Sequence, residues 1–403
     1  MPCCAKKSPC CEPPLVRLIP PPLSLYVHLP WCVRKCPYCD FNSHAQRGGL
    51  PFAEYIEALI RDLEHDLPLV WGRTVHSVFF GGGTPSLFAP EHIDAFLQQA
   101  SARLRFAPGL EITLETNPGT VEHGPFSGYL KAGVNRLSFG VQSFDDGSLQ
   151  RLGRIHDSGD AERAVKTAQD AGFTNINLDL MYALPGQTLP MALADIERAI
   201  ALSPTHLSHY QLTLEPNTLF ASKPPPDIPD DDLGWDMQEA CQAHIAAAGF
   251  TQYEVSAYAR PGQQCAHNLN YWQFGDYLGI GAGAHGKISF GHDGRILRRW
   301  KHKHPASYLA QAGSAAAIGG DEYLDAERRP FDFMLNALRL VDGFDLHAFE
   351  HRTGLPRQAI AQELDLAFAR GWLEASGEHI RPTELGQRFT NDVIALFLHT
   401  DPT

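Results

Sequence analysis

Short apolar runs alternate with amphipathic segments from Leu23 to about Leu214. Segments with helical spacing, such as Phe52–Leu67 and Ala161–Ala171, separate the apolar runs, and Gly172 follows the second as a helix-ending residue. Parallel strands need long crossovers, so this alternation predicts an α/β protein with a parallel sheet. Six runs have the length and composition of β-strands: Leu25–Leu29, Val75–Phe80, Glu111–Glu115, Arg136–Phe139, Asn175–Leu180 and Leu207–Leu212.

Six strands are fewer than the eight that close a full barrel, so we expect a partial (β/α)6 barrel. In such a sheet the functional site lies at the C-terminal ends of the strands. We expect four parts along the chain: a Cys/Pro-rich tail (1–22), the partial barrel (23–222), a segment that completes the cavity (223–325) and a C-terminal helical, winged-helix-like domain (326–403). The Pro- and Asp-rich run Ser222–Asp232 predicts a linker or exposed loop, and Phe331–Leu340 predicts a helix.

Composition narrows the class of protein. The 403 residues include 33 Lys and Arg against 46 Asp and Glu, a net charge of −13, which argues against a general nucleic-acid binder. No apolar run reaches the roughly 18 residues of a membrane helix, and the first residues lack the apolar core of a signal peptide. We therefore expect a cytoplasmic protein without an integral membrane span. The nine cysteines are odd in number and clustered, which favours metal or cluster chemistry over a disulfide framework.

Three cysteines form a compact motif directly after the first predicted strand. Cys32, Cys36 and Cys39 have the spacing C-x3-C-x2-C, and thiolates are the preferred ligands of iron–sulfur clusters and soft metals. If three thiolates hold a cube-shaped iron–sulfur cluster with four irons, one iron has no protein ligand and its coordination position is open. A structural zinc site is the alternative, with His28 or His44 as the fourth ligand. The four N-terminal cysteines receive no assigned role: Cys3, Cys4, Cys10 and Cys11.

The segment from Tyr26 to Cys39 resembles the radical S-adenosylmethionine (radical SAM) superfamily. Within it, the chain from about Leu23 onward is similar to the oxygen-independent coproporphyrinogen III dehydrogenases and their haem-chaperone relatives, the HemW type. The resemblance implies a 4Fe–4S cluster held by the three cysteines, with a unique iron that binds SAM. It also implies an electron donor, whose electron would cleave SAM to methionine and a 5′-deoxyadenosyl radical while the protein orients the cofactor.

The resemblance also assigns SAM-binding positions. The glycines that follow the second predicted strand let backbone groups approach a ligand, and a charged Asp179 inside an apolar strand is costly unless it is paired. A surface ion pair between Arg154 and Glu115 is an alternative for those two residues. The positions that match the family are Tyr26, Gly82, Gly83, Thr84, Glu115, Gln142, Arg154 and Asp179.

Two features separate the branches of this family. Coproporphyrinogen dehydrogenases carry a further cysteine two residues after the third ligand, where this chain has Phe41. The segment from His267 to Trp272 reproduces the H-N-x-x-Y-W motif of the haem chaperones. A histidine can ligate haem iron and aromatic rings can cover a porphyrin face. A satisfied core histidine is the alternative for His267, and Cys265 is another conceivable axial ligand.

These observations predict a haem chaperone that binds haem and delivers it to acceptor proteins. The alternative is an oxygen-independent coproporphyrinogen III dehydrogenase, or another radical SAM oxidoreductase that acts on a tetrapyrrole. A DNA-binding regulator is disfavoured because the C-terminal part has few Lys or Arg. A peripheral membrane contact and the turnover of SAM stay open.

Two further segments complete the predictions. We expect the Gly-rich Tyr277–Gly286 to line the cofactor cavity, since it lacks the residues of a phosphate loop. The basic run from Arg295 to Lys303 is typical of a solvated strand face, with haem propionates or an acidic partner as alternative contacts.

Overall fold

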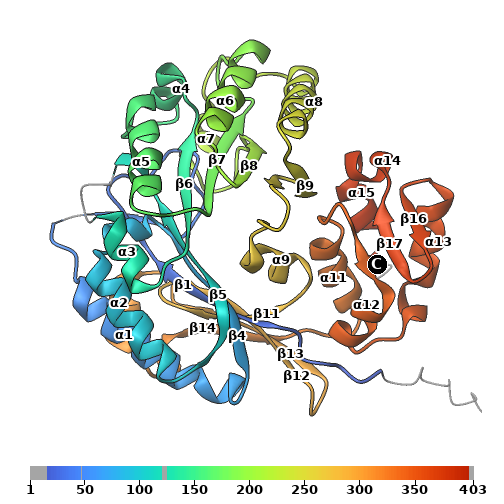
Figure 1. The fold of residues 1–403 in the computed structure, drawn as a ribbon. Coiled ribbons are helices and arrows are strands. Elements are labelled where there is room, and N and C mark those ends of the chain that lie inside the picture. Colours follow the sequence, from blue (N-terminus) through green and yellow to red (C-terminus); the bar gives the residue numbers. More distant parts are fainter. Residues whose placement is uncertain (1–15, 47, 120–124, 399–403) are drawn as a thin grey trace, which may run out of the picture.

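All six predicted strands are present and pair in parallel, each with its neighbour in chain order. The computed structural model describes residues 16–46, 48–119 and 125–398, so the four N-terminal cysteines lie outside it. The prediction of a parallel α/β sheet is therefore confirmed (Figure 1). The strands are β1 (Leu23–Leu29), β4 (Thr74–Gly82), β5 (Arg105–Thr116), β6 (Arg136–Gln142), β7 (Ile176–Tyr182) and β8 (His206–Gln211).

The sheet is wider than the sequence predicts. A further parallel strand, β11 (Asp276–Ile280), pairs with β1 and carries three antiparallel strands in turn: β12 (His285–Phe290), β13 (Arg295–Lys301) and β14 (Ile318–Tyr323). At the other end, β10 (Ala257–Ala259) and β9 (Thr251–Glu254) continue antiparallel from β8. Within the described residues, twelve strands form this one sheet.

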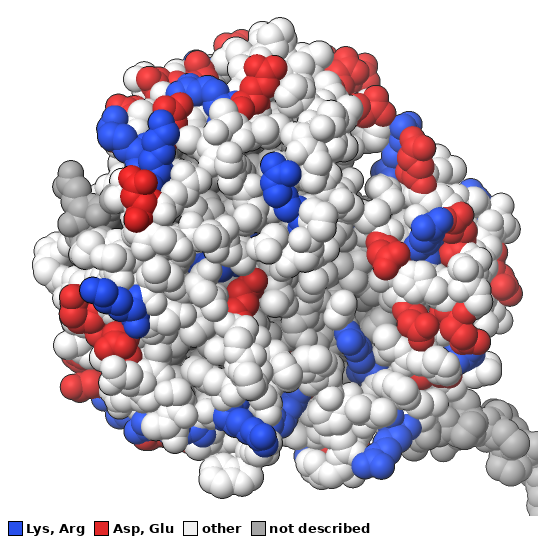
Figure 2. Space-filling view, viewed as in Figure 1, with Lys and Arg blue, Asp and Glu red and all other residues white. Residues whose placement is uncertain are grey.

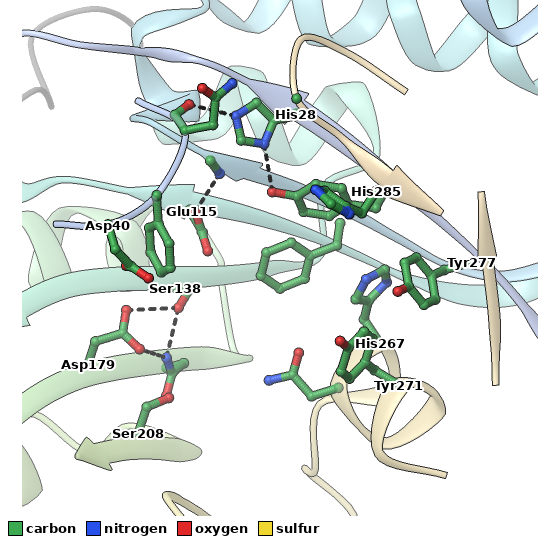
Figure 3. A pocket seen from close by; sticks show the side chains of 18 of the residues that line it. His28, Asp40, Glu115, Ser138, Asp179, Ser208, His267, Tyr271, Tyr277 and His285 are labelled. Atoms are coloured by element: carbon green, nitrogen blue, oxygen red, sulfur yellow. Dashed lines mark hydrogen bonds between the residues drawn. The ribbon is translucent and has the colours of Figure 1, made fainter. Parts of the chain in front are cut away.

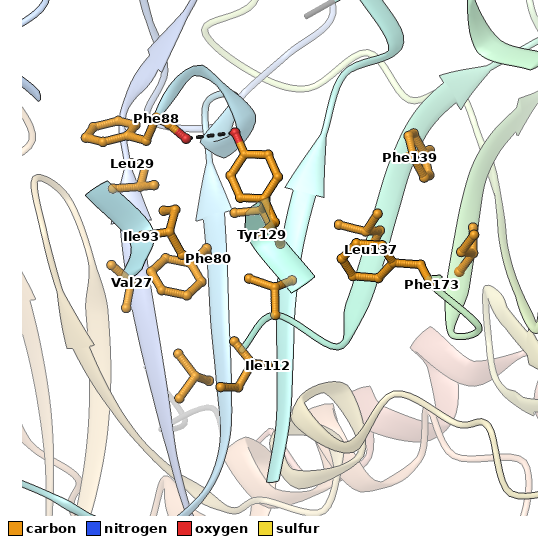
Figure 4. Packing of buried hydrophobic residues seen from close by; sticks show 14 of the residues in the cluster. Val27, Leu29, Phe80, Phe88, Ile93, Ile112, Tyr129, Leu137, Phe139 and Phe173 are labelled. Carbon is orange, nitrogen blue, oxygen red and sulfur yellow. Dashed lines mark hydrogen bonds between the residues drawn. The ribbon is translucent and has the colours of Figure 1, made fainter. Parts of the chain in front are cut away.

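Helices cover the outer face of the sheet, and Figure 1 shows them following one another around the curve. Their apolar faces and the outward side chains of the strands form one large core. Figure 4 shows part of it, where Val27, Phe80 and Leu137 point toward the helices and the Tyr129 hydroxyl donates to the Phe88 carbonyl at 2.8 Å. The covering helices are α1 (Phe52–Asp66), α2 (Pro90–Ser101), α3 (Phe126–Ala132), α4 (Asp146–Arg151), α5 (Ser158–Asp170), α6 (Leu189–Ala201) and α8 (Asp231–Ala247).

Side chains alternate between the two faces of each strand, and this decides what reaches the inner face. On β1, Leu25, Val27 and Leu29 belong to the core with the helices, whereas Tyr26 and His28 point to the opposite side. The same two-residue period runs through the neighbouring strands. The concave side of the sheet is therefore lined by polar and aromatic residues.

The C-terminal part has its own core, which contacts the rest of the chain through a few residues. Leu18, just before β1, and Phe274 are buried in it. Figure 1 shows this unit beside the open edge of the curved sheet. It comprises α11 (Arg329–Ala337), α12 (Leu346–Thr353), α13 (Ala361–Ala369), α14 (Glu384–Arg388), α15 (Thr390–Ala395) and a three-stranded sheet of β15 (Phe344–Asp345), β16 (Leu373–Ser376) and β17 (His379–Pro382).

The prediction that the basic run from Arg295 to Lys303 forms a solvated strand face is wrong for Lys301 and Arg299. Lys301 is 1% exposed, and its ammonium donates to Asp66 of α1 at 2.7 Å and to Asp62 of α1. Arg299 donates to Asp66 at 2.6 Å. These ion pairs tie β13 to α1, because a buried charge is tolerated only when it is paired and hydrogen-bonded.

Short elements complete the chain: β2 (Trp31–Cys32), β3 (His44–Ala45), α7 (Leu219–Ser222), α9 (Ala266–Trp272), α10 (Pro305–Gln311) and the 3-10 turns η1 (Leu67–Val70), η2 (Pro85–Leu87), η4 (Ala315–Ala317) and η5 (Arg357–Ile360). Among the helices in the described ranges, none combines the length and apolar character needed to cross a membrane.

Candidate functional site

Two adjoining cavities lie against the inner face and the C-terminal ends of the strands. The smaller measures about 150 Å³ and the larger about 550 Å³, and the larger has the size of a small-molecule site. Figure 3 shows the larger one, with side chains from several strands and from α9 converging on it. The two cavities share five wall residues: Phe41, Gly82, Glu115, Ser138 and Asp179.

The cysteine loop forms one wall of the smaller cavity. Cys32 ends β2, and the loop folds back so that the Cys39 amide donates to the Cys36 carbonyl at 3.2 Å. The three thiols are free, half-buried and lie on the cavity wall together. The Arg154 guanidinium lies 3.6 Å from the Cys36 sulfur. Three cysteines with an adjacent cation fit the donor set of an iron–sulfur cubane.

The described residues hold no fourth ligand in place for the zinc alternative. His28 donates from Nε2 to the Asn42 carbonyl at 2.9 Å, and its Nδ1 accepts from the Tyr26 hydroxyl at 3.0 Å, so both ring nitrogens are engaged. His44 contacts the Lys303 carbonyl through Nε2. In the described parts of the chain, no three His, Cys, Asp or Glu side chains are already placed to hold a single metal ion. A cubane binds each thiolate to a different iron, so its ligands stand farther apart than those of one ion.

Glycines after β4 bring the backbone close to the cysteine segment. A Cβ added at Gly82 would lie 2.5 Å from the His28 ring, and one at Gly83 would lie 2.4 Å from the Trp31 carbonyl. The Gly82 backbone has a φ of +116°, which L side chains rarely adopt. Only glycine fits these two positions, and both face the smaller cavity together with Thr84.

The other predicted SAM-binding residues also lie in the cavity walls. Gln142 accepts a hydrogen bond from the Tyr210 hydroxyl at 2.9 Å, and Arg154 donates to the Gly140 carbonyl at 2.6 Å. The Arg154 Nε is buried and has no partner, so a donor remains for a ligand. Glu115 accepts from the Gly82 amide at 3.1 Å and makes no ion pair with Arg154, so the surface-pair alternative is wrong. Tyr26 lines the larger cavity, and Asp179 lines both.

Sequence reasoning missed the polar residues that surround Asp179. Ser138 and Asn177 donate to its carboxylate at 3.2 and 2.8 Å, and Ser208 donates to the Asn177 side chain at 3.2 Å. Figure 3 shows this cluster on one side of the cavity. All three occupy inward positions of β6, β7 and β8. The signal that locates them is the alternation within each predicted strand, which places a polar residue opposite the apolar core positions.

Glu115 carries a perturbed carboxyl. Burial, and next the nearby Asp179, raise the pKa of Glu115 to about 8. An unfolded chain loses this proton near pH 4.5, so between about pH 4.5 and 8 the folded state binds more protons than the unfolded state. The contribution of Glu115 to the free energy of unfolding therefore falls as pH rises through this window, by at most about 1.4 kcal/mol per pH unit.

Glu115→Gln should flatten this dependence. The amide can still accept from the Gly82 amide but binds no proton in this range. We expect the stability advantage of the variant over the wild type to grow from pH 5.5 to pH 7.5, measured by urea unfolding without ligands. Glu57→Gln, at an exposed position of α1, is the control and should leave the difference constant. Parallel curves for wild type and Glu115→Gln would contradict the raised pKa.

Helix α9 carries the H-N-x-x-Y-W motif to the larger cavity. His267 and Tyr271 are four residues apart, so they share one helix face, and both line the cavity with Trp272. The His267 Nδ1 lies 3.1 Å from the Ser77 hydroxyl, and among the described residues its Nε2 has no hydrogen-bond partner. Burial, and next the charge of Arg136, lower the pKa of His267 to about 3, so its ring is neutral. A neutral imidazole with a free Nε2 is a competent iron ligand.

Cys265 does not share this position. Its side chain is fully buried, its sulfur donates to Glu111 at 3.4 Å, and it is absent from the cavity wall.

The prediction that the Gly-rich segment lines the cavity is confirmed, since Tyr277, Gly283 and His285 all belong to the wall. Around the periphery of the face in Figure 2, charged side chains of both signs are intermingled, whereas the centre is mostly uncharged.

Comparisons with known proteins agree with the motifs. The sequence model of the Radical SAM superfamily matches residues 26–199, and that of the HemN C-terminal domain matches residues 324–389. The heme chaperone HemW of Escherichia coli is 50% identical over 378 residues, which cover 94% of this chain and 98% of that protein. The heme chaperone HemW of Haemophilus influenzae is 49% identical over 388 residues, with coverage of 94% and 98%.

A solved structure is similar over most of its length. Coproporphyrinogen III oxidase (HemN) from Escherichia coli, a radical SAM enzyme, superposes with a TM-score of 0.78. The match covers 94% of this chain and 91% of that chain at 24% identity. At this identity the likeness concerns the fold alone.

Proposed function

Because this chain belongs to the family of the heme chaperone HemW, within the radical SAM superfamily, we propose that it binds haem and delivers it to acceptor proteins. The observation that carries the proposal is the position of His267 in the larger cavity. The ring is neutral, is held through Nδ1 by Ser77, and lies beside the Phe79 ring at 5.0 Å between centroids. Tyr271 and Trp272 line the same cavity. These residues supply an iron ligand and aromatic surface for a macrocycle.

The smaller cavity is the place for the cofactors that the superfamily implies. Cys32, Cys36 and Cys39 would hold the 4Fe–4S cluster, which supplies an open iron for SAM and a route for electrons. At Gly82, Gly83 and Thr84 the backbone would lie close enough to contact SAM. The Arg154 Nε is free to donate a hydrogen bond to an anionic group. Glu115, Gln142 and Asp179 supply further hydrogen-bonding groups, and Tyr26 holds His28 in place.

Phe41 supports haem binding over porphyrinogen oxidation. Its side chain is 61% exposed and lies in the walls of both cavities, between the cysteine loop and the aromatic residues. The site therefore presents an apolar ring where the related dehydrogenases are expected to present a thiol. The electron donor, a peripheral membrane contact and a cytoplasmic location stay predictions.

His267→Ala tests the haem site. We expect the variant to bind haem at least about tenfold more weakly, because it loses an iron ligand and a ring in the wall. The measurement is an anaerobic titration followed by the Soret band of the bound haem. His244→Ala, on α8 and outside both cavities, is the matched control. Superimposable titration curves for His267→Ala and wild type would remove His267 from the site.

The alternative enzyme is tested on the same reconstituted protein. Incubation with SAM, a reductant and coproporphyrinogen III should yield no protoporphyrinogen if the chain is a chaperone. Formation of that product would favour the dehydrogenase.

A further inference from the structure

One buried cation of the larger cavity has no role in the site described so far. Arg136 begins β6, is 2% exposed, and faces the cavity on the same side as Ser138. Among the described residues its guanidinium makes no hydrogen bond, and its Nε is buried without a partner. A guanidinium carries five N–H donors, and a buried donor without an acceptor is destabilising. Such a group in a cavity wall points to an anionic ligand.

Three carboxyl groups lie near this guanidinium, those of Glu111, Glu115 and Asp179, and none of them accepts a hydrogen bond from it. Glu111 Oε2 lies 4.0 Å from the Arg136 Nε, which is beyond hydrogen-bond distance. The other oxygen of Glu111 is used by α9: it accepts from the amides of Ala266 at 3.0 Å and His267 at 3.4 Å, and from Cys265. Glu111 thus fixes the start of α9 and, with Glu115 and Asp179, balances part of the charge of Arg136. The N–H donors of Arg136 stay free for a ligand in the cavity.

Arg136 and His267 line the same cavity and share Glu111 as a neighbour, whose two oxygens lie 4.0 Å from the Arg136 Nε and 3.4 Å from the His267 amide nitrogen. The positive charge of Arg136, after the effect of burial, lowers the imidazole pKa of both His267 and His206. The same cavity wall continues to Tyr271 and Trp272, which offer aromatic surface. An anionic group bound by Arg136 would therefore belong to the ligand that contacts His267.

We propose that Arg136 is the carboxylate-binding residue of the larger cavity, where it receives a carboxylate of an anionic porphyrin in bidentate geometry next to His267. This inference rests on the proposed haem-binding function and adds the orientation of the ligand: a carboxylate-bearing edge lies against β6. The planar guanidinium matches two carboxylate oxygens, and a charge-assisted pair in a buried site is stronger than a neutral hydrogen bond.

The test compares haem with haem dimethyl ester, whose two carboxylates are esterified while the iron and macrocycle stay the same. Both are titrated into the full-length protein from the same solvent stock. We expect wild type to prefer haem by about tenfold or more, the size of a charge-assisted contact. Arg136→Gln should bind the ester as wild type does and lose the preference for haem. Arg136→Lys keeps the positive charge but lacks the planar guanidinium group, so it should retain only part of the preference for haem.

Lys166→Gln is the matched control. Lys166 is exposed on α5 and lines neither cavity, and we expect the variant to keep the preference for haem. Circular dichroism checks the fold, and if Arg136→Gln is unfolded then Arg136→Lys with the two ligands carries the comparison. Equal affinity of wild type for both ligands, an undiminished preference in the Arg136 variants, or an equal loss of the preference in Lys166→Gln would overturn the proposal. Failure of wild type to bind either ligand would instead contradict haem binding itself.

Discussion

Replacement of Cys32, Cys36 and Cys39 by alanine should abolish the iron–sulfur cluster. The three thiols line the smaller cavity together. The other cysteines in the described ranges, Cys241 and Cys265, do not line it. A cubane that loses all of its protein thiolates has nothing to hold it. After anaerobic reconstitution we expect acid-labile sulfide and bound iron to fall to background, together with the visible absorption of the cluster. Binding of SAM should be lost as well, because its anchoring iron is gone.

Cys241→Ala provides the matched control. Cys241 is buried in α8 among core residues, away from both cavities, so its loss removes a thiol without touching the loop. This variant should reconstitute a full cluster. Retention of iron and sulfide by the triple variant would contradict the assignment of the cysteine loop and favour a site formed by other cysteines.

Lys301→Met should lower the stability of the protein strongly. Lys301 is enclosed by Asp62 and Asp66, and Asp62 also accepts from the Tyr308 hydroxyl at 2.8 Å and the Gly281 amide at 3.1 Å. Without the ammonium, two buried carboxylates face each other with Arg299 as their remaining cation. Breaking a buried ion pair from one side costs about 3–5 kcal/mol. The midpoint of urea unfolding measures this change.

The neighbouring Lys303→Met isolates the effect of burial. Lys303 lies two residues further along the chain, is exposed, and makes no ion pair within the described residues. We expect its substitution to change the free energy of unfolding by less than about 0.5 kcal/mol. Equal midpoints for the two variants would show that the ion pairs around Lys301 do not hold β13 to α1.

Local signals in the sequence are sufficient to predict much of this molecule. A short apolar run predicts the strand Arg136–Phe139, and the structure extends it to Gln142. The cysteine loop and Gly82 are expected at strand ends because parallel strands present their carboxyl ends on one side. The structure brings the predicted SAM-binding residues together around two cavities, as that rule requires.

Long-range pairing accounts for what the sequence does not predict. The parallel strand β11 lies beside β1, although the two are far apart in the chain, and no periodicity within either segment indicates this register. The basic run shows the same limit: the partners of Arg299 and Lys301 are on α1, which only the folded chain brings near. In the sequence Arg136 is simply the first residue of an apolar strand, and its missing acceptors become visible only in three dimensions.

The wall common to both cavities has a thermodynamic consequence. Glu115 and Asp179 face both spaces, and each is hydrogen-bonded to neighbours that also belong to the wall. A ligand in either cavity that alters the protonation or position of these carboxyls changes the free energy of binding in the other. Such coupling is reciprocal: the factor by which the first ligand changes the affinity for the second equals the factor in the reverse direction. If the larger cavity binds haem and the smaller one SAM, as proposed, the two affinities are linked through two carboxyl groups. Measuring one affinity with and without the other ligand then gives the coupling in both directions.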